Sequence, residues 1–182
     1  MGSLLEWYEK LSDYFPEHEM KHPQQLKELI EENDYYHKEE TDDYLMLYAD
    51  FPSFVFIDYL LVTSNTRGKG MGTKILDRLK AKGKLIILEA EPVLPKDSDS
   101  ERRLRFYYRN GFKKADLIRY VRRDEQDEPY TMHVLYWSPA GIPQAIVLEK
   151  MELACDEIHN FRSKRHYGRE LVDLDEALKW KH

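Results

Sequence analysis

Cysteine is almost absent from this sequence, and so are long apolar runs. Cys155 is the single cysteine among 182 residues, which excludes an internal disulfide framework and a zinc cluster built on cysteine. No apolar run approaches the length of a membrane-spanning helix, and the first residues lack the basic and then apolar pattern of a signal peptide. We therefore expect a cytoplasmic protein that does not act at a membrane. With 42% hydrophobic and 34% charged residues, the chain is typical of one globular domain.

Basic residues are scarce at the start of the chain. Residues 1–50 contain four basic and fourteen acidic residues, whereas the whole chain has a net charge of −6, so residues 51–182 are net basic. This asymmetry favours a cationic substrate near the first region and a phosphate-rich cofactor near the second. Acidic residues that only solvate helix ends and a turn would give the same pattern.

One match to a metal-binding motif is unfavourably placed. His18 to His22 reads His-Glu-Met-Lys-His, a zinc-protease spacing that requires both histidines on one helical face. Pro16 and Pro23 bound the segment, and the residue before a proline is disfavoured in the α region. No third ligand is suitably spaced. We interpret the match as a coincidence and expect no metal.

The most informative stretch runs from Phe54 to Gly83. Residues 54–62 form an apolar run, residues 67–72 form a glycine-rich loop, and apolar residues then recur at helical spacing. Glycines let backbone N–H groups approach an anion, and the helix N-terminus adds partial positive charge. This order of strand, loop and helix predicts a phosphate-binding site. Seven basic residues surround a single acidic one, Asp77: Arg67, Lys69, Lys74, Arg78, Lys80, Lys82 and Lys84.

The glycine loop fails two nucleotide-binding fingerprints. A Walker A loop needs Gly-Lys followed by Ser or Thr, and a dinucleotide loop needs its third glycine one residue later than Gly72. The loop does fit the pattern Arg-x-x-Gly-x-Gly, as Arg67, Gly70 and Gly72, five residues after the strand-ending Val62. In this it resembles the pyrophosphate loop of the GNAT superfamily of acyl-CoA N-acyltransferases.

A second motif lies further along the chain. Residues 106–112 read Phe-Tyr-Tyr-Arg-Asn-Gly-Phe and resemble the Phe-Tyr-x-x-x-Gly-Phe signature of the same family, on a helix expected over residues 98–110. The two motifs occur in the family's order, separated by one strand and one loop, so the resemblance covers about residues 35–138. Two features depart from the family. No convincing strand precedes Leu4, and Ser100 stands where the family often has asparagine.

The resemblance also implies a fold. A strand, a helix and a strand between residues 54 and 91 form a βαβ unit whose two apolar strands are parallel and buried. We expect an α+β, GNAT-like mixed sheet, mainly antiparallel with a central parallel pair, flanked by helices. Residues 1–138 would be the acyltransferase core and residues 139–182 a C-terminal helical extension. Other expected elements are helices over residues 3–15, 23–33 and 98–110 (the last capped by Ser98 or Asp99), and hairpins of residues 35–40 with 43–50 and of residues 113–123 with 129–138.

The extension beyond the resemblance carries one narrow apolar stripe. We expect a long helix from about Pro143 to Gly168 and a second, shorter one through Leu171, Leu174 and Leu178. The stripe predicts that the first helix packs either on its own sheet or against a second subunit. The sequence thus leaves two alternatives, an intramolecular contact and a homodimer. The short basic run at residues 162–166 has no interleaved aromatics and does not predict nucleic-acid binding. The stripe consists of Val147, Met151, Ala154, Ile158 and Phe161.

The resemblance implies transfer of an acetyl group from acetyl-CoA to a primary amine of a small molecule or peptide, by direct attack in a ternary complex. Tyr107 matches the family tyrosine that commonly protonates the leaving thiolate. Glu89 and Glu91 share one face at a strand end, and because close carboxylates raise one pKa, they are candidates for the base that deprotonates the amine. Asp58 interrupts an apolar strand and must be hydrogen-bonded if it is buried. Its carboxylate would either satisfy backbone groups at a β-bulge or take part in catalysis.

The cofactor of this family lies between the fourth and fifth strands. Pantetheine would pair with the backbone of residues 60–62, pyrophosphate would bind N–H groups of residues 67–73, and Arg102 or Arg103 would reach the adenosine 3′-phosphate. A non-catalytic acyl-CoA-binding or regulatory module is an alternative that the sequence does not separate from an enzyme. A nucleotide-binding module is a third function class, and the two failed fingerprints disfavour it. The expected cofactor-binding residues are Leu60, Leu61, Val62, Arg67, Gly68, Lys69, Gly70, Met71, Gly72, Thr73, Ser100 and Arg103.

Overall fold

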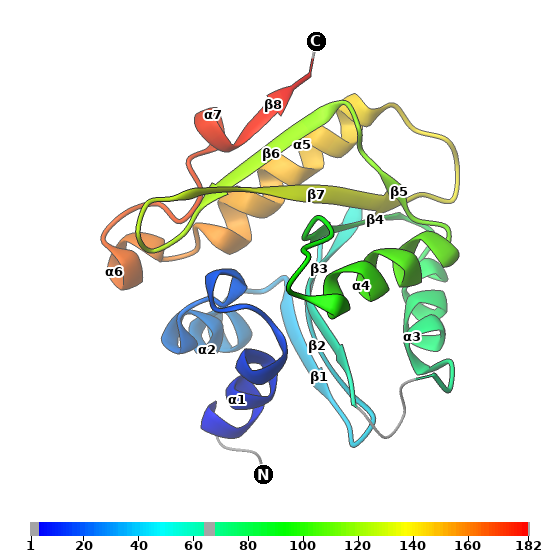
Figure 1. Cartoon of the computed structure of the whole chain (residues 1–182), viewed down its shortest axis with the longest axis horizontal. Coiled ribbons are helices and arrows are strands. Elements are labelled where there is room, and N and C mark those ends of the chain that lie inside the picture. Colours follow the sequence, from blue (N-terminus) through cyan, green and yellow to red (C-terminus); the bar gives the residue numbers. More distant parts are fainter. Residues whose placement is uncertain (1–3, 64–67, 182) are drawn as a thin grey trace.

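The computed structural model describes residues 4–63 and 68–181 (Figure 1). Its centre is a mixed sheet of eight strands in the order β1–β2–β3–β4–β7–β6–β8, with β5 paired to β7. β3 and β4 are parallel, and the other pairs are antiparallel. This confirms the predicted fold class. The strands are β1 (Tyr36–Glu40), β2 (Tyr44–Asp50), β3 (Phe54–Val62), β4 (Leu85–Ala90), β5 (Lys113–Lys114), β6 (Ile118–Arg123), β7 (Pro129–Trp137) and β8 (Leu178–Trp180).

Helices cover both faces of the sheet. Apolar side chains from α1, α2 and α5 join one face in a single cluster, and those from α3 and α4 join the other face. Strands β3 and β4 are apolar on both faces because they lie between these layers. No helix within the described residues is long and apolar enough to cross a bilayer. The helical elements are α1 (Leu4–Tyr14), the 3₁₀ turn η1 (Glu17–Glu19), α2 (Pro23–Glu32), α3 (Met71–Lys80), α4 (Ser98–Arg109), α5 (Gln144–Ala154), the π turn η2 (Cys155–His159), α6 (Ser163–Tyr167) and α7 (Leu174–Ala177).

The two central strands pair over only part of their length. β3 pairs with β4 from Phe54 to Ile57, and β3 then continues to Val62 without a β4 partner. The register of β2 against β3 shifts at the same point, since Leu47 faces Tyr59 and Tyr48 faces Ile57, which leaves Asp58 as the extra residue of a β-bulge. The second half of β3 therefore extends past its pairing with β4, as an opening for a cofactor requires.

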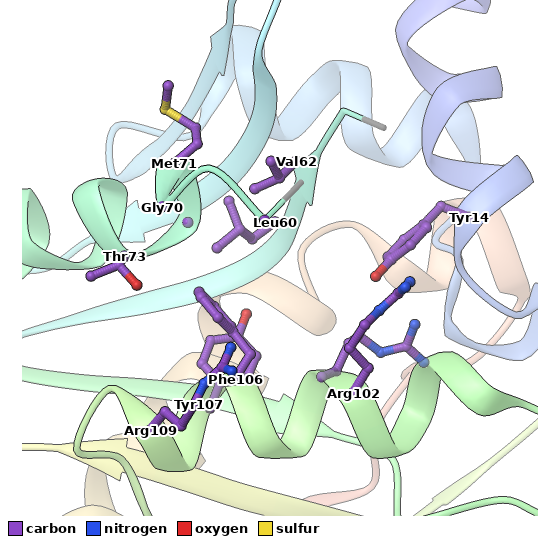
Figure 2. Close-up of a pocket in the computed structure, with 13 residues that line it drawn as sticks. Tyr14, Leu60, Val62, Gly70, Met71, Thr73, Arg102, Phe106, Tyr107 and Arg109 are labelled. Carbon is purple, nitrogen blue, oxygen red and sulfur yellow. The ribbon is translucent and has the colours of Figure 1, made fainter. Parts of the chain in front are cut away.

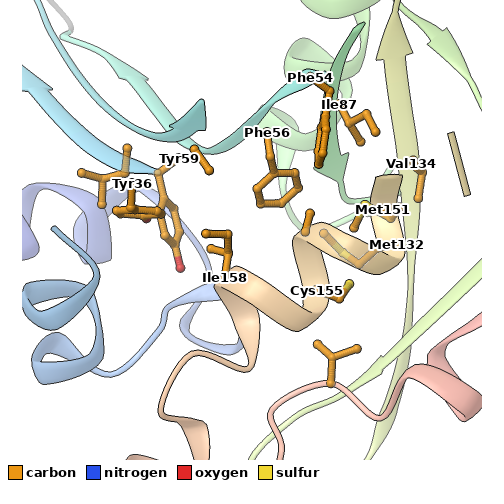
Figure 3. Packing of buried hydrophobic residues seen from close by; sticks show 14 of the residues in the cluster. Tyr36, Phe54, Phe56, Tyr59, Ile87, Met132, Val134, Met151, Cys155 and Ile158 are labelled. Atoms are coloured by element: carbon orange, nitrogen blue, oxygen red, sulfur yellow. The ribbon is translucent and has the colours of Figure 1, made fainter. Parts of the chain in front are cut away.

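The C-terminal segment packs on its own sheet. Met151, Cys155 and Ile158 are fully buried against the cluster that contains Phe56 and Met132 (Figure 3). The apolar stripe is thus covered within one chain. The predicted long helix is interrupted, however, because α5 passes into the π turn η2 and Arg162 adopts a left-handed φ of 52° before α6.

Three sequence-based expectations about elements were wrong. Leu178 does not end a second helix but begins β8, which pairs with the edge of β6. Residues 113–123 are not one strand, because β5 and β6 pair separately with β7. Helix α4 is capped neither by Ser98 nor by Asp99 but by Asp97, whose carboxylate accepts a hydrogen bond from the Asp99 backbone N–H at 3.0 Å.

Candidate active site

The glycine loop places a helix N-terminus at the opening beside β3. Gly68 and Gly70 have positive φ values of 80° and 78°, which favour glycine, and Gly70 is the N-cap of α3. No side chain among the described residues caps this helix, so its first N–H groups and their partial positive charge remain for a ligand. This geometry suits an anion, and phosphate binding by the loop and helix stays a prediction.

A cavity of about 610 Å³ connects this element to α4 (Figure 2). Its walls come from the end of β3, the glycine loop, one side of α4 and one side chain of α1. Three arginines and no carboxylate are found among its described lining residues, so the cavity suits an anionic ligand with an apolar portion. The lining residues are Tyr14, Leu60, Val62, Gly68, Gly70, Met71, Gly72, Thr73, Arg102, Arg103, Phe106, Tyr107 and Arg109.

The two sequence motifs meet in this cavity. Gly72 packs so closely against the Phe106 ring that a Cβ atom at Gly72 would lie 2.6 Å from it. Glycine is thus required here by the approach of α4 to α3, whereas at Gly70 it is favoured by the backbone angle. The glycine loop and the aromatic signature form one unit.

Tyr107 lies at the inner wall of the cavity, behind Phe106 in Figure 2. Its side chain is buried, and its ring contacts Phe106 and Phe112 edge-on with centroids 5.0 and 5.5 Å apart. Burial, followed by the nearby Tyr14, raises the pKa of the Tyr107 hydroxyl. The hydroxyl therefore keeps its proton at neutral pH and can act as a proton donor.

Most of the expected cofactor-binding residues lie around this cavity. Leu60 and Val62 line it. The side chain of Leu61 points to the opposite face of the sheet, so only the Leu61 backbone could contact a ligand in this cavity. Lys69 is exposed within the loop but is not among the lining residues. Arg67 lies outside the described residues.

Two expected contacts of α4 have other partners. The Ser100 hydroxyl donates to the Asp97 carbonyl at 2.6 Å and accepts from the Leu94 N–H at 2.9 Å, so it organises the loop before α4 and does not line the cavity. Arg103 does line the cavity, where its guanidinium stacks over Tyr14 at 5.4 Å and pairs with Asp97 at 3.3 Å.

Glu89 is held in a buried ion-pair network. Its carboxylate accepts from Arg122 at 3.3 Å and from His159 of the C-terminal segment. Although burial acts to raise the pKa of Glu89, its interactions with His159 and with the Arg122 guanidinium lower that pKa to about 2. The structure therefore does not give Glu89 the raised pKa that the sequence suggested.

Glu91 is buried just beyond β4 and faces the α1–α2 connection. One carboxylate oxygen pairs with His18, and the other, Oε2, is buried with no hydrogen-bond donor among the described residues. The ring of His18 contacts Tyr130 of β7, whose hydroxyl donates to the His18 carbonyl at 3.2 Å.

Glu19 is a site candidate that the sequence did not reveal. Burial, followed by the charge of Glu91, raises the pKa of Glu19 to about 8. Its Oε2 atom is also buried with no donor among the described residues, while the hydroxyl of Tyr59 donates to its backbone carbonyl at 2.7 Å. The crowding of two carboxyl groups that was expected within β4 thus occurs between Glu91 and Glu19.

Comparison with known proteins identifies the family. A GNAT-family protein of Bacteroides thetaiotaomicron has a similar fold, with a TM-score of 0.66, 21% identity, and coverage of 91% of this chain and 92% of that chain. A GNAT-family protein of Desulfovibrio desulfuricans gives a TM-score of 0.50 at 17% identity, with 75% and 91% covered. The protein "Putative acetyltransferase YjbC" of Bacillus subtilis (strain 168) is 43% identical over 176 residues, which are 96% of this chain and 92% of that protein. The chain belongs to the GNAT superfamily. No protein-family model matches it.

This GNAT protein has a second buried ion pair beneath its β-bulge. Lys21 Nζ contacts both carboxylate oxygens of Asp58 at 2.8 and 2.9 Å, and the Tyr36 hydroxyl donates to the same carboxylate at 2.6 Å. The bulge expected at Asp58 is present, but side chains rather than backbone groups satisfy the carboxylate. Its role is to attach the α1–α2 connection to β3.

The two histidines of the zinc-protease match lie in different elements of this GNAT protein. His18 belongs to η1, and His22 is the N-cap of α2, where its ring accepts from the Gln24 N–H at 3.1 Å. They do not share a helical face. The segment instead contributes Glu19 and His18 to the region beside Glu91, and no spacing rule for metals or catalytic motifs would have identified that role.

Proposed function

We propose that this chain transfers an acetyl group from acetyl-CoA to a primary amine of a small molecule or peptide, by direct attack in a ternary complex. Membership of the GNAT superfamily supports the reaction class. The observation that carries the proposal is the cavity in which the glycine loop, the end of β3 beyond its β4 pairing and Tyr107 come together.

The cofactor would lie along this cavity. Its pyrophosphate would bind the N–H groups at the start of α3, and its pantetheine would follow the backbone of β3 from Leu60 to Val62. Arg102 and Arg103 would attract the 3′-phosphate. With this orientation the thioester reaches the inner end of the cavity, where Tyr107 lies.

The transfer requires two proton movements at that end. The amine nitrogen attacks the thioester carbonyl, a C–N bond forms, and the C–S bond breaks. Tyr107 gives its proton to the leaving sulfur. The carboxyl pair of Glu19 and Glu91 takes the proton that the amine loses. A base with a pKa of about 8, as at Glu19, is well matched to that role near neutral pH.

A thiol-release assay with purified protein tests the proposal. Acetyl-CoA and a panel of primary amines should release free coenzyme A at a rate that depends on the amine, and mass spectrometry should find the acetylated amine. If coenzyme A binds with no turnover for any amine, the alternative of a non-catalytic acyl-CoA-binding module holds. If coenzyme A does not bind, the cofactor assignment itself is wrong.

A further inference from the structure

A second cavity, of about 320 Å³, opens on the outer side of the α1–α2 connection. Four segments that are distant in sequence form it: α1, the η1–α2 connection, the turn between β6 and β7, and α6 of the C-terminal segment. It shares no lining residue with the cofactor cavity. Its lining residues are Tyr8, Ser12, Glu17, Met20, His22, Pro23, Glu125, His166 and Tyr167.

The charge of this second cavity is negative. Glu17 and Glu125 are exposed on its walls, and no lysine or arginine occurs among its described lining residues. Both carboxylates act on the half-buried Tyr8, since the pKa of its hydroxyl is raised by burial and then by Glu125 and Glu17. Two carboxylates from separate parts of the chain thus line the same cavity as Tyr8.

The opposite wall is aromatic and is fixed by hydrogen bonds. The rings of His22 and His166 stack with centroids 5.3 Å apart, and Tyr167 meets His22 edge-on. The Tyr167 hydroxyl donates to Gln25 Oε1 at 2.8 Å and accepts from the His22 N–H at 2.6 Å. His166 also pairs with Glu28. This wall is formed before any ligand arrives, which lowers the cost of binding.

The short turn η1 connects this cavity to the proposed reaction site. Glu17 lines the second cavity, while the next residue, His18, pairs with Glu91. Glu19 follows and belongs, with Glu91, to the proposed carboxyl pair. Three consecutive residues therefore lead from the second cavity to the proposed base.

We propose that the second cavity binds a cationic group of the acceptor, such as a second ammonium or a guanidinium, remote from the amine that is acetylated. The inference rests on the proposed acetyl transfer. Carboxylates at the mouth attract the cation, and the faces of Tyr8 and Tyr167 stabilise it once it is partly desolvated. Monoamines without a second charge would lose both contributions.

Paired acceptors test this proposal. The wild-type protein should have a kcat/KM for 1,4-diaminobutane about tenfold above that for butylamine, because the exposed carboxylates and the ring faces each add a modest stabilisation. The double variant Glu17→Gln/Glu125→Gln should reduce that ratio to near one. The matched control is Glu128→Gln, which removes an exposed carboxylate from the same β6–β7 turn but does not line the cavity, and it should keep the ratio.

Direct binding separates this proposal from the acetyl-transfer assignment. Calorimetric titration of 1,4-diaminobutane into the coenzyme A complex should give a Kd that rises about tenfold in the double variant and changes little in the control. If the diamine binds in this way but no amine is acetylated, the cavity assignment stands and the proposed function fails. If amines are acetylated at a ratio that the double variant leaves unchanged, the cavity assignment is overturned alone.

Discussion

The two cavities differ in charge and in the kind of chain that forms them. The cofactor cavity contains three arginines and is formed by regular elements, namely the end of β3, the start of α3 and α4. The second cavity contains two carboxylates and is formed by a 3₁₀ turn, a hairpin turn and a five-residue helix together with α1. Each cavity nevertheless draws residues from both the acidic start and the basic remainder of the sequence, since Tyr14 lines the first and Glu125 lines the second. The comparison teaches that a site on regular elements can be predicted from a sequence motif. A site on short irregular segments can be found only once the fold is known.

The largest effect should come from filling the contact between the two motifs. In Gly72→Val the new side chain would overlap the Phe106 ring, because even a Cβ atom would lie 2.6 Å from it. We expect calorimetric binding of coenzyme A to become undetectable. The control Gly141→Val places its side chain where nothing lies within 4 Å of the Cβ atom, and it should bind normally. Normal binding by a folded Gly72→Val protein would separate the motif from the cofactor cavity.

Removing the proposed proton donor should lower turnover strongly and leave cofactor binding unchanged. Tyr107→Phe removes only the hydroxyl, so kcat should fall roughly a hundredfold while the Kd of coenzyme A stays the same. Tyr108→Phe is the matched control, because that side chain is 44% exposed and does not line the cofactor cavity. Unchanged turnover in Tyr107→Phe would mean that another group or water protonates the thiolate.

Glu89 should differ from the proposed reactive pair, Glu19 and Glu91, in its contribution to the stability of the fold. Glu89→Gln should lower the free energy of unfolding at pH 7 by about 3–5 kcal/mol, because Arg122 loses its buried partner. In the wild type the pKa of Glu89 is lowered to about 2, so its contribution is present above its unfolded pKa near 4.5 and is lost as pH falls toward 2. Urea unfolding at several pH values measures this. A Glu89→Gln protein as stable as wild type would refute the structural role.

The reactive pair should determine the pH dependence of the reaction. Because the pKa of Glu19 is raised to about 8, its basic form predominates only above that pH, and kcat/KM should rise with pH through about 8. Glu19→Gln should remove this limb and reduce kcat/KM at pH 8 about tenfold or more, and Glu91→Gln should shift the limb to lower pH by removing a neighbouring negative charge. Profiles that match wild type in both variants would exclude the pair as the base.

The smallest effect should come from the charge at the mouth of the cofactor cavity. Arg102 is exposed and already pairs with Asp99, so Arg102→Gln should weaken coenzyme A binding only about threefold, with the difference disappearing at high salt. Arg105→Gln removes the same charge from α4 at a position that does not line this cavity, and it should leave the Kd unchanged. Equal weakening in both variants would indicate a general field rather than a local contact.

Most of the central fold could be predicted from the sequence because its signals are local. The apolar runs of β3 and β4, with helical spacing between them, specify a βαβ unit wherever they occur. Leu178 was assigned to a helix because three leucines share a helical spacing, yet an unpaired edge of β6 made the strand β8 more favourable. Local pattern cannot show that an edge is available.

The carboxylates show the same limit at the site. Glu89 and Glu91 lie two residues apart at the end of β4, but their partners Arg122, His159 and His18 come from three other parts of the chain. Those partners determine that Glu89 is ion-paired by arginine, whereas Glu91 has an oxygen with no donor among the described residues. Spacing gives the positions of titratable groups, and only tertiary packing gives their charge states.

The most direct test of the account is one reaction with the wild-type protein: acetyl-CoA and 1,4-diaminobutane incubated together, with the product identified by mass spectrometry. The account predicts that the diamine gains a single acetyl group, and that one free thiol is released for each product formed. Binding of coenzyme A without any acetylated diamine or other acetylated amine would contradict it.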